Sequence, residues 1–439
     1  MYILYDLIFL LFATAYLPIF LFRKKFHRGF KMRLGILPKH LKLEHPIWVH
    51  AVSVGEVMAV RHLIEDLRAA YPDKKLVIST VTTTGNKIAK GIAREGDFVP
   101  YLPLDLSFII RGVVDKIQPS AFVLVETEIW PNLISYLYRK NIPIVVVNGR
   151  ISDASFNGYL GIRFLLKPVL NKINLFCVQT ERDAERLIRL GAAKNKLEIT
   201  GNMKFDIGDY TPACRQAGIF PLKRDPASRE KRDYTDYKIK LGLKAEEKLF
   251  VCGSTHPGEE EIILEVYKNL CNDYPDLRLL IAPRHPERAS EIARLIKKFG
   301  FEVIRISLLN RRTGEPANRR TVFVLDTVGQ LMNYYCLADF VFVGGSLIKK
   351  GGHNILEPAS QEKPILFGPY MFNFRDIAGL FIENKACILV HNRDELSLSI
   401  RDLLNNPAGM ATLGKRAKEL ILENQGATKR NLGCIKKLL

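Results

Sequence analysis

Residues 249–254 read LFVCGS, and this apolar run restarts an alternation of strands and helices that already fills the first half of the chain. Further apolar runs follow it, each separated from the next by an amphipathic or polar stretch. They are LRLLIAP (277–283), FEVIRI (301–306), TVFVLD (321–326), FVFVGGS (340–346) and PILFGP (364–369). Strands that are apolar throughout are buried on both faces, as in a parallel sheet covered by helices. The second half therefore predicts a doubly wound α/β domain.

The first half carries the same pattern. Its strand candidates are IWVHAV (47–52), LVIST (76–80), AFVLVE (121–126), PIVVVN (143–148) and LFCVQT (175–180). Residues 206–240 separate the halves, because this segment is polar, contains three prolines and shows no clear period. We expect two Rossmann-like domains, over 46–205 and 241–439, facing a central cleft and joined by a linker or insertion over 206–240.

Composition excludes several classes of protein. Hydrophobic residues make up 47% of the 439 residues and charged residues 25%, which is ordinary globular usage and not that of a disordered or collagen-like chain. The net charge of +19 favours a negatively charged partner such as nucleic acid, phosphorylated lipid or a membrane surface. The seven cysteines form no C-x-x-C pair or zinc-like spacing, so reduced thiols in a cytosolic compartment are expected.

The N-terminal residues predict membrane association. Residues 2–22, YILYDLIFLLFATAYLPIFLF, hold a single charge, and as a helix they would extend for about 30 Å, the thickness of a hydrocarbon core. Eight Lys and Arg residues follow between 23 and 42, a cluster that stays on the cytoplasmic side and attracts anionic lipid. We predict an anchor helix over 1–22, with Asp6 near its far end in reach of water, and a basic juxtamembrane segment over 23–45. A helix lying in the interface is the alternative.

Carboxylates follow two of the strands in the first half. The stretch HAVSVGE (50–56) ends on Glu56, in the first turn of the helix expected there. A glutamate at this place is either favoured by the helix dipole or acts as a general base toward a substrate hydroxyl. VETEIWPN (125–132) places Glu126 and Glu128 at the end of another strand, where buried carboxylates need partners. Ligands of such sheets bind outside the carboxyl ends of the strands, which makes these residues site candidates.

Basic and glycine-rich segments occupy the corresponding places further along. TGNMKFD (200–206) carries Lys204, which is either a solvated lysine or a partner for a phosphate or sugar carboxylate. The main-chain N–H groups of the turn GSTHPGEEE (253–261) could cradle an anion. In IAPRHPER (281–288), Arg284 follows a strand directly and is placed to bind a phosphate or carboxylate.

Two more strand-end segments complete the set, DTVGQL (326–331) and the glycine-rich GGSLIKKGGHNILEP (344–358). Taken in order, HAVSVGE, VETEIWPNL, GNMKF, GSTHPGEE, PRHPER and VGGSLIKKGGHNILEP followed by FGPYMFNF resemble the 3-deoxy-D-manno-octulosonic acid (Kdo) transferases of lipopolysaccharide assembly. The resemblance extends from residue 48 to about residue 375, and the N-terminal apolar segment fits it too.

The resemblance implies an inverting, metal-independent glycosyltransferase of the GT-B fold. Such an enzyme moves Kdo from CMP-Kdo to a lipid A precursor, lipid IVA, and releases CMP at the cytoplasmic face of the inner membrane. It implies no cofactor, no metal and no nucleic-acid partner, with anionic inner-membrane lipid around the anchor. This agrees with the chemistry, because basic side chains can stabilise a monophosphate leaving group.

The resemblance also assigns roles to residues. The family's proton acceptor falls on Glu56, and its two supporting groups fall on Glu126 and Lys204. Its CMP-binding positions fall on Pro283, Arg284, Val328, Gly329, Gln330, Asn354, Ile355, Leu356 and Glu357. Gln330 departs from the family pattern, which often has Glu there.

Two other functions fit parts of the sequence. A GT-B sugar-nucleotide epimerase would explain two α/β halves and a nucleotide pocket, but neither the apolar segment nor the basic residues that follow it. A non-catalytic, membrane-tethered anion-binding protein would explain the net charge. No RNP-like aromatic pattern or compact basic recognition helix supports nucleic-acid binding.

Overall fold

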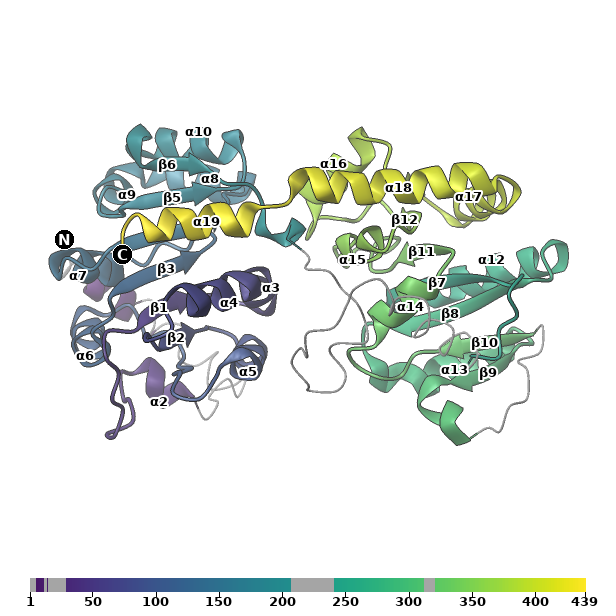
Figure 1. Ribbon diagram of the computed structural model, residues 1–439, viewed down its shortest axis with the longest axis horizontal. Coiled ribbons are helices and arrows are strands. Elements are labelled where there is room, and N and C mark those ends of the chain that lie inside the picture. Colours follow the sequence, from purple (N-terminus) through teal and green to yellow (C-terminus); the bar gives the residue numbers. More distant parts are fainter. Residues whose placement is uncertain (1–4, 12–13, 15–28, 207–240, 312–319) are drawn as a thin grey trace. The chain divides into compact units, whose positions relative to one another are not determined.

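The computed structural model describes residues 5–11, 14, 29–206, 241–311 and 320–439 (Figure 1). The chain divides into two units. The first comprises Met1–Asp206 together with Asn424–Leu439, and the second comprises Ile207–Glu423. Apart from Asp206, the predicted linker 206–240 lies outside the described residues. The expectation of two α/β domains is confirmed, and each unit is described below by itself.

The first unit is built on a six-stranded parallel sheet with the strand order β2-β1-β3-β4-β5-β6. The strands are β1 (Ile47–His50), β2 (Leu76–Ser79), β3 (Ala121–Val125), β4 (Ile144–Gly149), β5 (Leu175–Val178) and β6 (Leu197–Ile199). The first five coincide with the predicted apolar runs. Strand β6 was not predicted, because three residues with a polar Glu198 in the middle do not form an apolar run.

Helices cover both faces of this sheet. They are α2 (Phe30–Arg33), α3 (Val54–Ala59), α4 (Arg61–Ala70), α5 (Thr83–Ile92), α6 (Ser107–Ile117), α7 (Pro131–Arg139), α8 (Asp153–Gly161), α9 (Arg163–Leu170), α10 (Glu181–Leu190) and α19 (Ala427–Lys436), with short 3-10 turns η1 (Lys194–Lys196) and η2 (Met203–Phe205).

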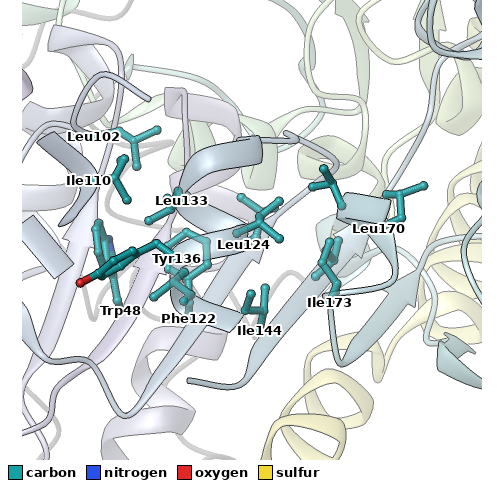
Figure 2. Packing of buried hydrophobic residues seen from close by; sticks show 14 of the residues in the cluster. Trp48, Leu102, Ile110, Phe122, Leu124, Leu133, Tyr136, Ile144, Leu170 and Ile173 are labelled. Carbon is teal, nitrogen blue, oxygen red and sulfur yellow. The ribbon is translucent and has the colours of Figure 1, made fainter. Parts of the chain in front are cut away.

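Successive strand residues point to opposite faces and so fill two separate cores. Trp48 and Phe122 pack on one face with Leu133 and Tyr136 of α7 (Figure 2). Their neighbour Val49 is buried on the other face, in a core that includes residues of α3 and α4.

The C-terminal helix α19 belongs to the first unit. It packs against α4, β4 and β5, and it contributes Ala427, Cys434 and Ile435 to the second core (Figure 1). The Asp206 carboxylate accepts hydrogen bonds from the main-chain N–H groups of Gly426, at 2.6 Å, and Thr428. Sequence analysis assigned residues 241–439 to one domain, and this assignment is wrong at its end. An amphipathic pattern reveals which face of a helix is buried, but not which domain buries it.

The N-terminal residues attach to the same unit. Residues 5–11 are helical, and the Asp6 carboxylate accepts hydrogen bonds from Ser107 N, at 3.1 Å, and Asn132 Nδ2, at 2.7 Å. Asp6 therefore caps the N-terminus of α6, and the expectation that it reaches water at the far side of a membrane is wrong. Most of the predicted anchor 1–22 lies outside the described residues. Within the described ranges, no helix is long and apolar enough to cross a membrane.

The second unit has a seven-stranded parallel sheet with the order β13-β12-β11-β7-β8-β10-β9. Its strands are β7 (Lys248–Thr255), β8 (Leu277–Pro283), β9 (Glu302–Arg305), β10 (Thr321–Val324), β11 (Phe340–Val343), β12 (Ile365–Phe367) and β13 (Ile388–Leu389). All six predicted runs are strands. Its helices are α12 (Glu259–Asp273), α13 (Ala289–Lys298), α14 (Leu331–Leu337), α15 (Leu356–Ser360), α16 (Arg375–Glu383), α17 (Arg393–Asn405) and α18 (Pro407–Asn424), with 3-10 turns η5 (Pro286–Arg288) and η6 (Ile306–Arg311).

Each sheet has a point at which the strand order changes direction. In the first unit it lies between β1 and β3, and in the second it lies between β7 and β11. Ligands of doubly wound sheets bind at such a point, outside the carboxyl ends of the strands. The strand order therefore directs attention to the loops that follow these four strands.

Candidate active site

A cavity of about 440 Å³ opens at the carboxyl ends of β1 and β3 in the first unit. It is lined by Glu56, Glu126, Thr127, Glu128, Ile129, Trp130, Arg150, Ser152, Ser155 and Tyr159. Two of the three residues predicted to act in catalysis line this cavity. The third, Lys204, pairs with one of them.

Glu56 is a buried carboxylate held by its own turn. Strand β1 leads into Ser53, the N-cap of α3, and Glu56 follows in the first helical turn. One carboxylate oxygen accepts a hydrogen bond from Val52 N at 2.6 Å, and the other accepts one from Ser53 Oγ at 2.9 Å. Burial, aided by the negative charges of Glu126 and Glu128, raises the pKa of Glu56 to about 7, although the Val52 hydrogen bond opposes this. A base with a pKa near the working pH is well suited to proton transfer.

Glu126 ends β3 in a left-handed backbone conformation, with φ of 57°. Its N–H still donates to Val147 O at 2.9 Å, so the residue leaves the sheet only after this last contact. A non-glycine residue at positive φ is strained, and such strain is concentrated at functional sites. The side chain lines the cavity, and Glu126 Oε1 lies 3.6 Å from Lys204 Nζ.

Lys204 is positioned by a short 3-10 turn, η2. Its neighbours Met203 and Phe205 are buried, and its own N–H donates to Asn202 Oδ1 at 2.9 Å. Met203 N donates to Asn148 Oδ1 at 2.9 Å, which attaches the turn to the end of β4. A lysine fixed in this way is not the freely solvated loop residue that the sequence also allowed.

The cavity also contains Glu128, a site candidate to which the sequence gave no specific role, and residues that the sequence did not single out. Burial, together with the charge of Glu126, raises the pKa of Glu128. Arg150 follows β4, and its N–H donates to Thr127 Oγ1 at 3.1 Å. Tyr159 of α8 reaches the same space. The sequence could have identified Arg150 as a site candidate, because it directly follows an apolar strand, as Glu126 does.

In the second unit, several predicted CMP-binding residues lie at the ends of β8 and β11. Arg284 follows β8 with an exposed side chain, and its N–H donates to Thr255 O at 3.0 Å. Asn354 Nδ2 donates to Glu357 Oε1 at 3.1 Å. Burial raises the pKa of Glu357, while the Asn354 hydrogen bond and the charge of Arg284 act in the opposite direction. Pro283, Ile355 and Leu356 are buried, so the last two can offer a ligand only their main-chain groups.

The remaining predicted positions form the turn between β10 and α14. Val328 is 86% exposed, and Gly329 has φ of 84°, a conformation that favours glycine. Gln330 Oε1 accepts a hydrogen bond from Thr327 Oγ1 at 3.0 Å, so the amide that stands where the family often has Glu supports the turn.

The glycine-rich loop after β11 is already occupied by a carboxylate of the chain itself. The fully buried Glu259 accepts hydrogen bonds from the N–H groups of Gly345 at 2.7 Å, Ser346 at 3.0 Å and Leu347 at 3.0 Å, and from His256 N at 3.1 Å. The expectation that the turn 253–261 offers its amides to an outside anion is therefore wrong for His256. Glu259 instead joins the loops that follow β7 and β11. Among the described residues, no group of three or more His, Cys, Asp or Glu side chains is arranged to hold a metal ion.

Comparison with known proteins adds independent information. A sequence profile of the family described as "3-Deoxy-D-manno-octulosonic-acid transferase (kdotransferase)" matches residues 28–207. The 3-deoxy-D-manno-octulosonic acid transferase of Haemophilus influenzae is 36% identical over 395 residues, which cover 90% of this chain and 87% of that protein. The protein of the same name from Chlamydia trachomatis serovar A is 28% identical over 418 residues, covering 94% and 91%.

Among solved structures, UDP-GlcNAc 2-epimerase from Neisseria meningitidis matches with a TM-score of 0.56 and 12% identity. The match covers 89% of this chain and 100% of the other. At this identity the likeness concerns the fold alone, which is the pair of parallel α/β units of the GT-B class.

Proposed function

The chain belongs to the Kdo transferase family, and from this premise we propose that it transfers Kdo from CMP-Kdo to the lipid A precursor lipid IVA and releases CMP. The protein is a glycosyltransferase of lipopolysaccharide biosynthesis. The single observation that supports a transfer mechanism most strongly is Glu56, a buried carboxylate with a pKa of about 7 in a cavity at the sheet's change of direction.

Glu56 acts as the general base in this proposal. A sugar hydroxyl of the acceptor attacks the anomeric carbon of Kdo, and Glu56 takes the hydroxyl proton as the new C–O bond forms. The bond from the anomeric carbon to the phosphate oxygen breaks, and CMP departs with the electron pair. Glu126 and Lys204 place opposite charges beside the reacting groups. Attack from the face opposite the leaving group inverts the anomeric configuration.

The second unit binds the leaving group. Arg284 neutralises the CMP phosphate, and Glu357 accepts hydrogen bonds from the ribose hydroxyls. Asn354 holds the Glu357 carboxylate in place at 3.1 Å. Because CMP is a monophosphate, basic side chains are sufficient to stabilise it, and the proposed mechanism includes neither a metal nor a cofactor.

We place the reaction at the cytoplasmic face of the inner membrane, where the acceptor lipid is anchored. Leu7, Ile8 and Leu11 expose 58%, 60% and 76% of their surface on the helix that Asp6 attaches to the first unit. The basic residues between 23 and 42 would attract anionic lipid. An apolar surface followed along the chain by basic residues supports association with a membrane surface.

The test is the release of CMP from CMP-Kdo by the purified protein, with and without lipid IVA, together with mass spectrometry of the lipid. A Kdo transferase releases CMP only with the acceptor and increases the lipid mass by one or more Kdo units. Turnover of the sugar nucleotide without lipid would point to an epimerase. Binding without release of CMP would point to a non-catalytic anion-binding protein.

A further inference from the structure

Two histidines that the proposed mechanism does not use meet at the change of strand direction in the second unit. His256 follows β7, and His353 lies in the loop after β11. Their Nε2 atoms are 2.9 Å apart, and their rings are nearly parallel, with an interplanar angle of 7° and centroids separated by 5.2 Å. Strand order and geometry therefore place this pair where a doubly wound sheet binds its ligand.

The backbone around the pair is built to bring the two rings together. Gly345 lies beside both at φ of 69°, and a Cβ atom there would come within 3.1 Å of the His353 ring and 3.4 Å of the His256 ring. The buried Glu259 accepts hydrogen bonds from the main-chain N–H groups of both His256 and Gly345. One carboxylate thus fixes the relative positions of the two loops that carry the histidines.

The surroundings of the pair are positively charged. Burial, followed by the charges of His285, Lys350, Arg288 and Arg284, lowers the pKa of His256. Arg288 is paired with Glu260 at 2.8 Å. Arg284 and Lys350, by contrast, form no ion pair with any residue that the structure describes. This part of the unit has positive charge that no carboxylate of the described chain balances at contact distance.

Burial and these neighbouring positive charges determine the protonation state of the two histidines. Burial, aided by Arg284 and His256, lowers the pKa of His353 to about 4, so both rings are neutral at pH 7. In a neutral pair one Nε2–H donates to the other Nε2, and the accepting ring carries its proton on Nδ1. Beyond this contact, the Nδ1–H of the accepting ring is a further hydrogen-bond donor. A bound anion would favour the uptake of a further proton.

The donor substrate of the proposed reaction has a group that matches this chemistry. Kdo is an ulosonic acid, so its anomeric carbon carries a carboxylate, and in CMP-Kdo the same carbon carries the phosphate oxygen. The donor therefore presents two anionic groups on one carbon atom. Arg284, which already acts electrostatically on His353, is assigned to the phosphate. The second anion needs donors next to it.

We propose that His256 and His353 form the subsite that binds the carboxylate of the ulosonic sugar. The inference rests on the proposed function and extends it to what recognises an acidic sugar. An ordinary hexose has no carboxylate on its anomeric carbon, so this subsite would distinguish the donor from nucleotide sugars of the neutral kind. Gly345 and Glu259 act as positioning residues, because they touch the histidines and not the sugar.

The experiment compares two ligands that differ by the acidic sugar. Dissociation constants for CMP and for CMP-Kdo are measured on the full chain, without acceptor, for the wild type, His256→Ala and His353→Ala. We expect CMP-Kdo to bind about 10- to 100-fold more weakly to either variant, which corresponds to about 1.4–2.8 kcal/mol. The affinity for CMP should stay within about twofold. His391→Ala is the matched control, because His391 is an exposed histidine of the same unit that pairs with Glu395 at 2.8 Å.

Unchanged CMP affinity also shows that a variant is folded. The proposal is overturned if both variants bind CMP-Kdo as the wild type does, or if the wild type binds CMP and CMP-Kdo equally. An equal loss of both ligands in His353→Ala and in the milder His353→Gln would assign the pair to the phosphate and would also overturn it. Failure of the proposed function looks different, since the wild type would then prefer CMP-Kdo over CMP but form no Kdo-bearing lipid.

Discussion

The ammonium nitrogen of Lys204 lies 3.6 Å from a carboxylate oxygen of Glu126, and this pair separates the roles of the carboxylates in the first-unit cavity. Lys204 balances the charge of Glu126. Glu56 forms no ion pair with any residue that the structure describes, and its contacts are the hydrogen bonds from Val52 and Ser53. Of Glu56 and Glu126, the carboxylate without a cation partner is the one suited to accept a proton, so we assign the base to Glu56 rather than to Glu126.

Replacing Glu56 with Gln should remove the base and keep the shape of the side chain. Turnover is expected to fall by about 10²–10⁴-fold, the usual contribution of general-base catalysis, while CMP affinity stays near that of the wild type. Steady-state kinetics and calorimetry measure the two quantities. Glu65→Gln is the control, because Glu65 is a surface carboxylate of the same unit paired with Arg68. A wild-type rate in Glu56→Gln with a slow Glu126→Gln would reverse the assignment.

The rate should also depend on pH in a defined direction. Burial raises the pKa of Glu56 to about 7, and only the deprotonated carboxylate can accept a proton. Therefore kcat/KM is expected to rise tenfold per pH unit below about 7 and to level off above it. A profile measured from pH 5 to 9 tests this. A rate that is flat between pH 5 and 7 would exclude Glu56 as the titrating base.

Lys204→Met should slow the transfer more than it weakens substrate binding. Loss of the cation removes a positive charge beside the reacting groups and leaves Glu126 unpaired. Removal of one stabilising donor from an active site typically costs about 10²–10³ in kcat. The control is Lys437→Met, since Lys437 forms a Lys–Glu pair at 3.1 Å on the surface of the same unit. Equal kinetics for the two variants would make the Lys204–Glu126 pair purely structural.

Arg284→Ala should weaken the binding of CMP. A hydrogen bond to a charged group contributes about 1.5–3 kcal/mol, so the dissociation constant is expected to rise roughly 10- to 150-fold. Arg294 is an exposed arginine on helix α13, and Arg294→Ala should leave the dissociation constant for CMP unchanged. Isothermal titration of CMP into the purified variants gives both values, and unaltered affinity in Arg284→Ala would remove this residue from the nucleotide site.

Two glycine substitutions should change stability in opposite directions. Gly345→Ala places a Cβ at φ of 69° and 3.1 Å from the His353 ring, so we expect it to destabilise the protein by about 1–2 kcal/mol. Gly379→Ala lies inside α16, where a Cβ meets nothing within 4 Å, and should stabilise it by about 0.5–1 kcal/mol. The free energies of unfolding of the two variants and the wild type are measured by urea denaturation followed by circular dichroism. The same sign for both would contradict the strained geometry assigned to Gly345.

Most strands could be predicted because a buried parallel strand is apolar along its whole length. Strand β13, Ile388–Leu389, escaped because two residues make no pattern, and β6 escaped because its middle residue is polar. The contacts of Asp6 and of α19 could not be predicted either. They connect positions that are more than one hundred residues apart, and no local period carries that information.

Part of the candidate site could likewise be predicted from the sequence, and part could not. The places of Glu126 and Arg284 followed from one rule, that a polar residue directly after a buried strand lies at the carboxyl edge of the sheet, and Glu56 followed from the first helical turn after β1. No rule predicted which group binds the main-chain N–H groups of the glycine-rich loop after β11. A glycine-rich turn looks the same in sequence whether its N–H groups wait for a phosphate or already bind Glu259. The His256–His353 contact was also missed, although each histidine stands directly in a strand-end loop.

The return of residues 424–439 to the first unit has a consequence for synthesis on the ribosome. These residues are translated after the whole of the second unit, yet Ala427, Cys434 and Ile435 complete a core that begins with β1. Domains usually fold in the order in which they emerge. Here the first unit emerges first, but the part of its sheet that α19 covers, at β4 and β5, stays open until the second unit has been made. A premature stop codon after Glu423 would spare every strand that the structure describes and still leave the core of the first unit incomplete.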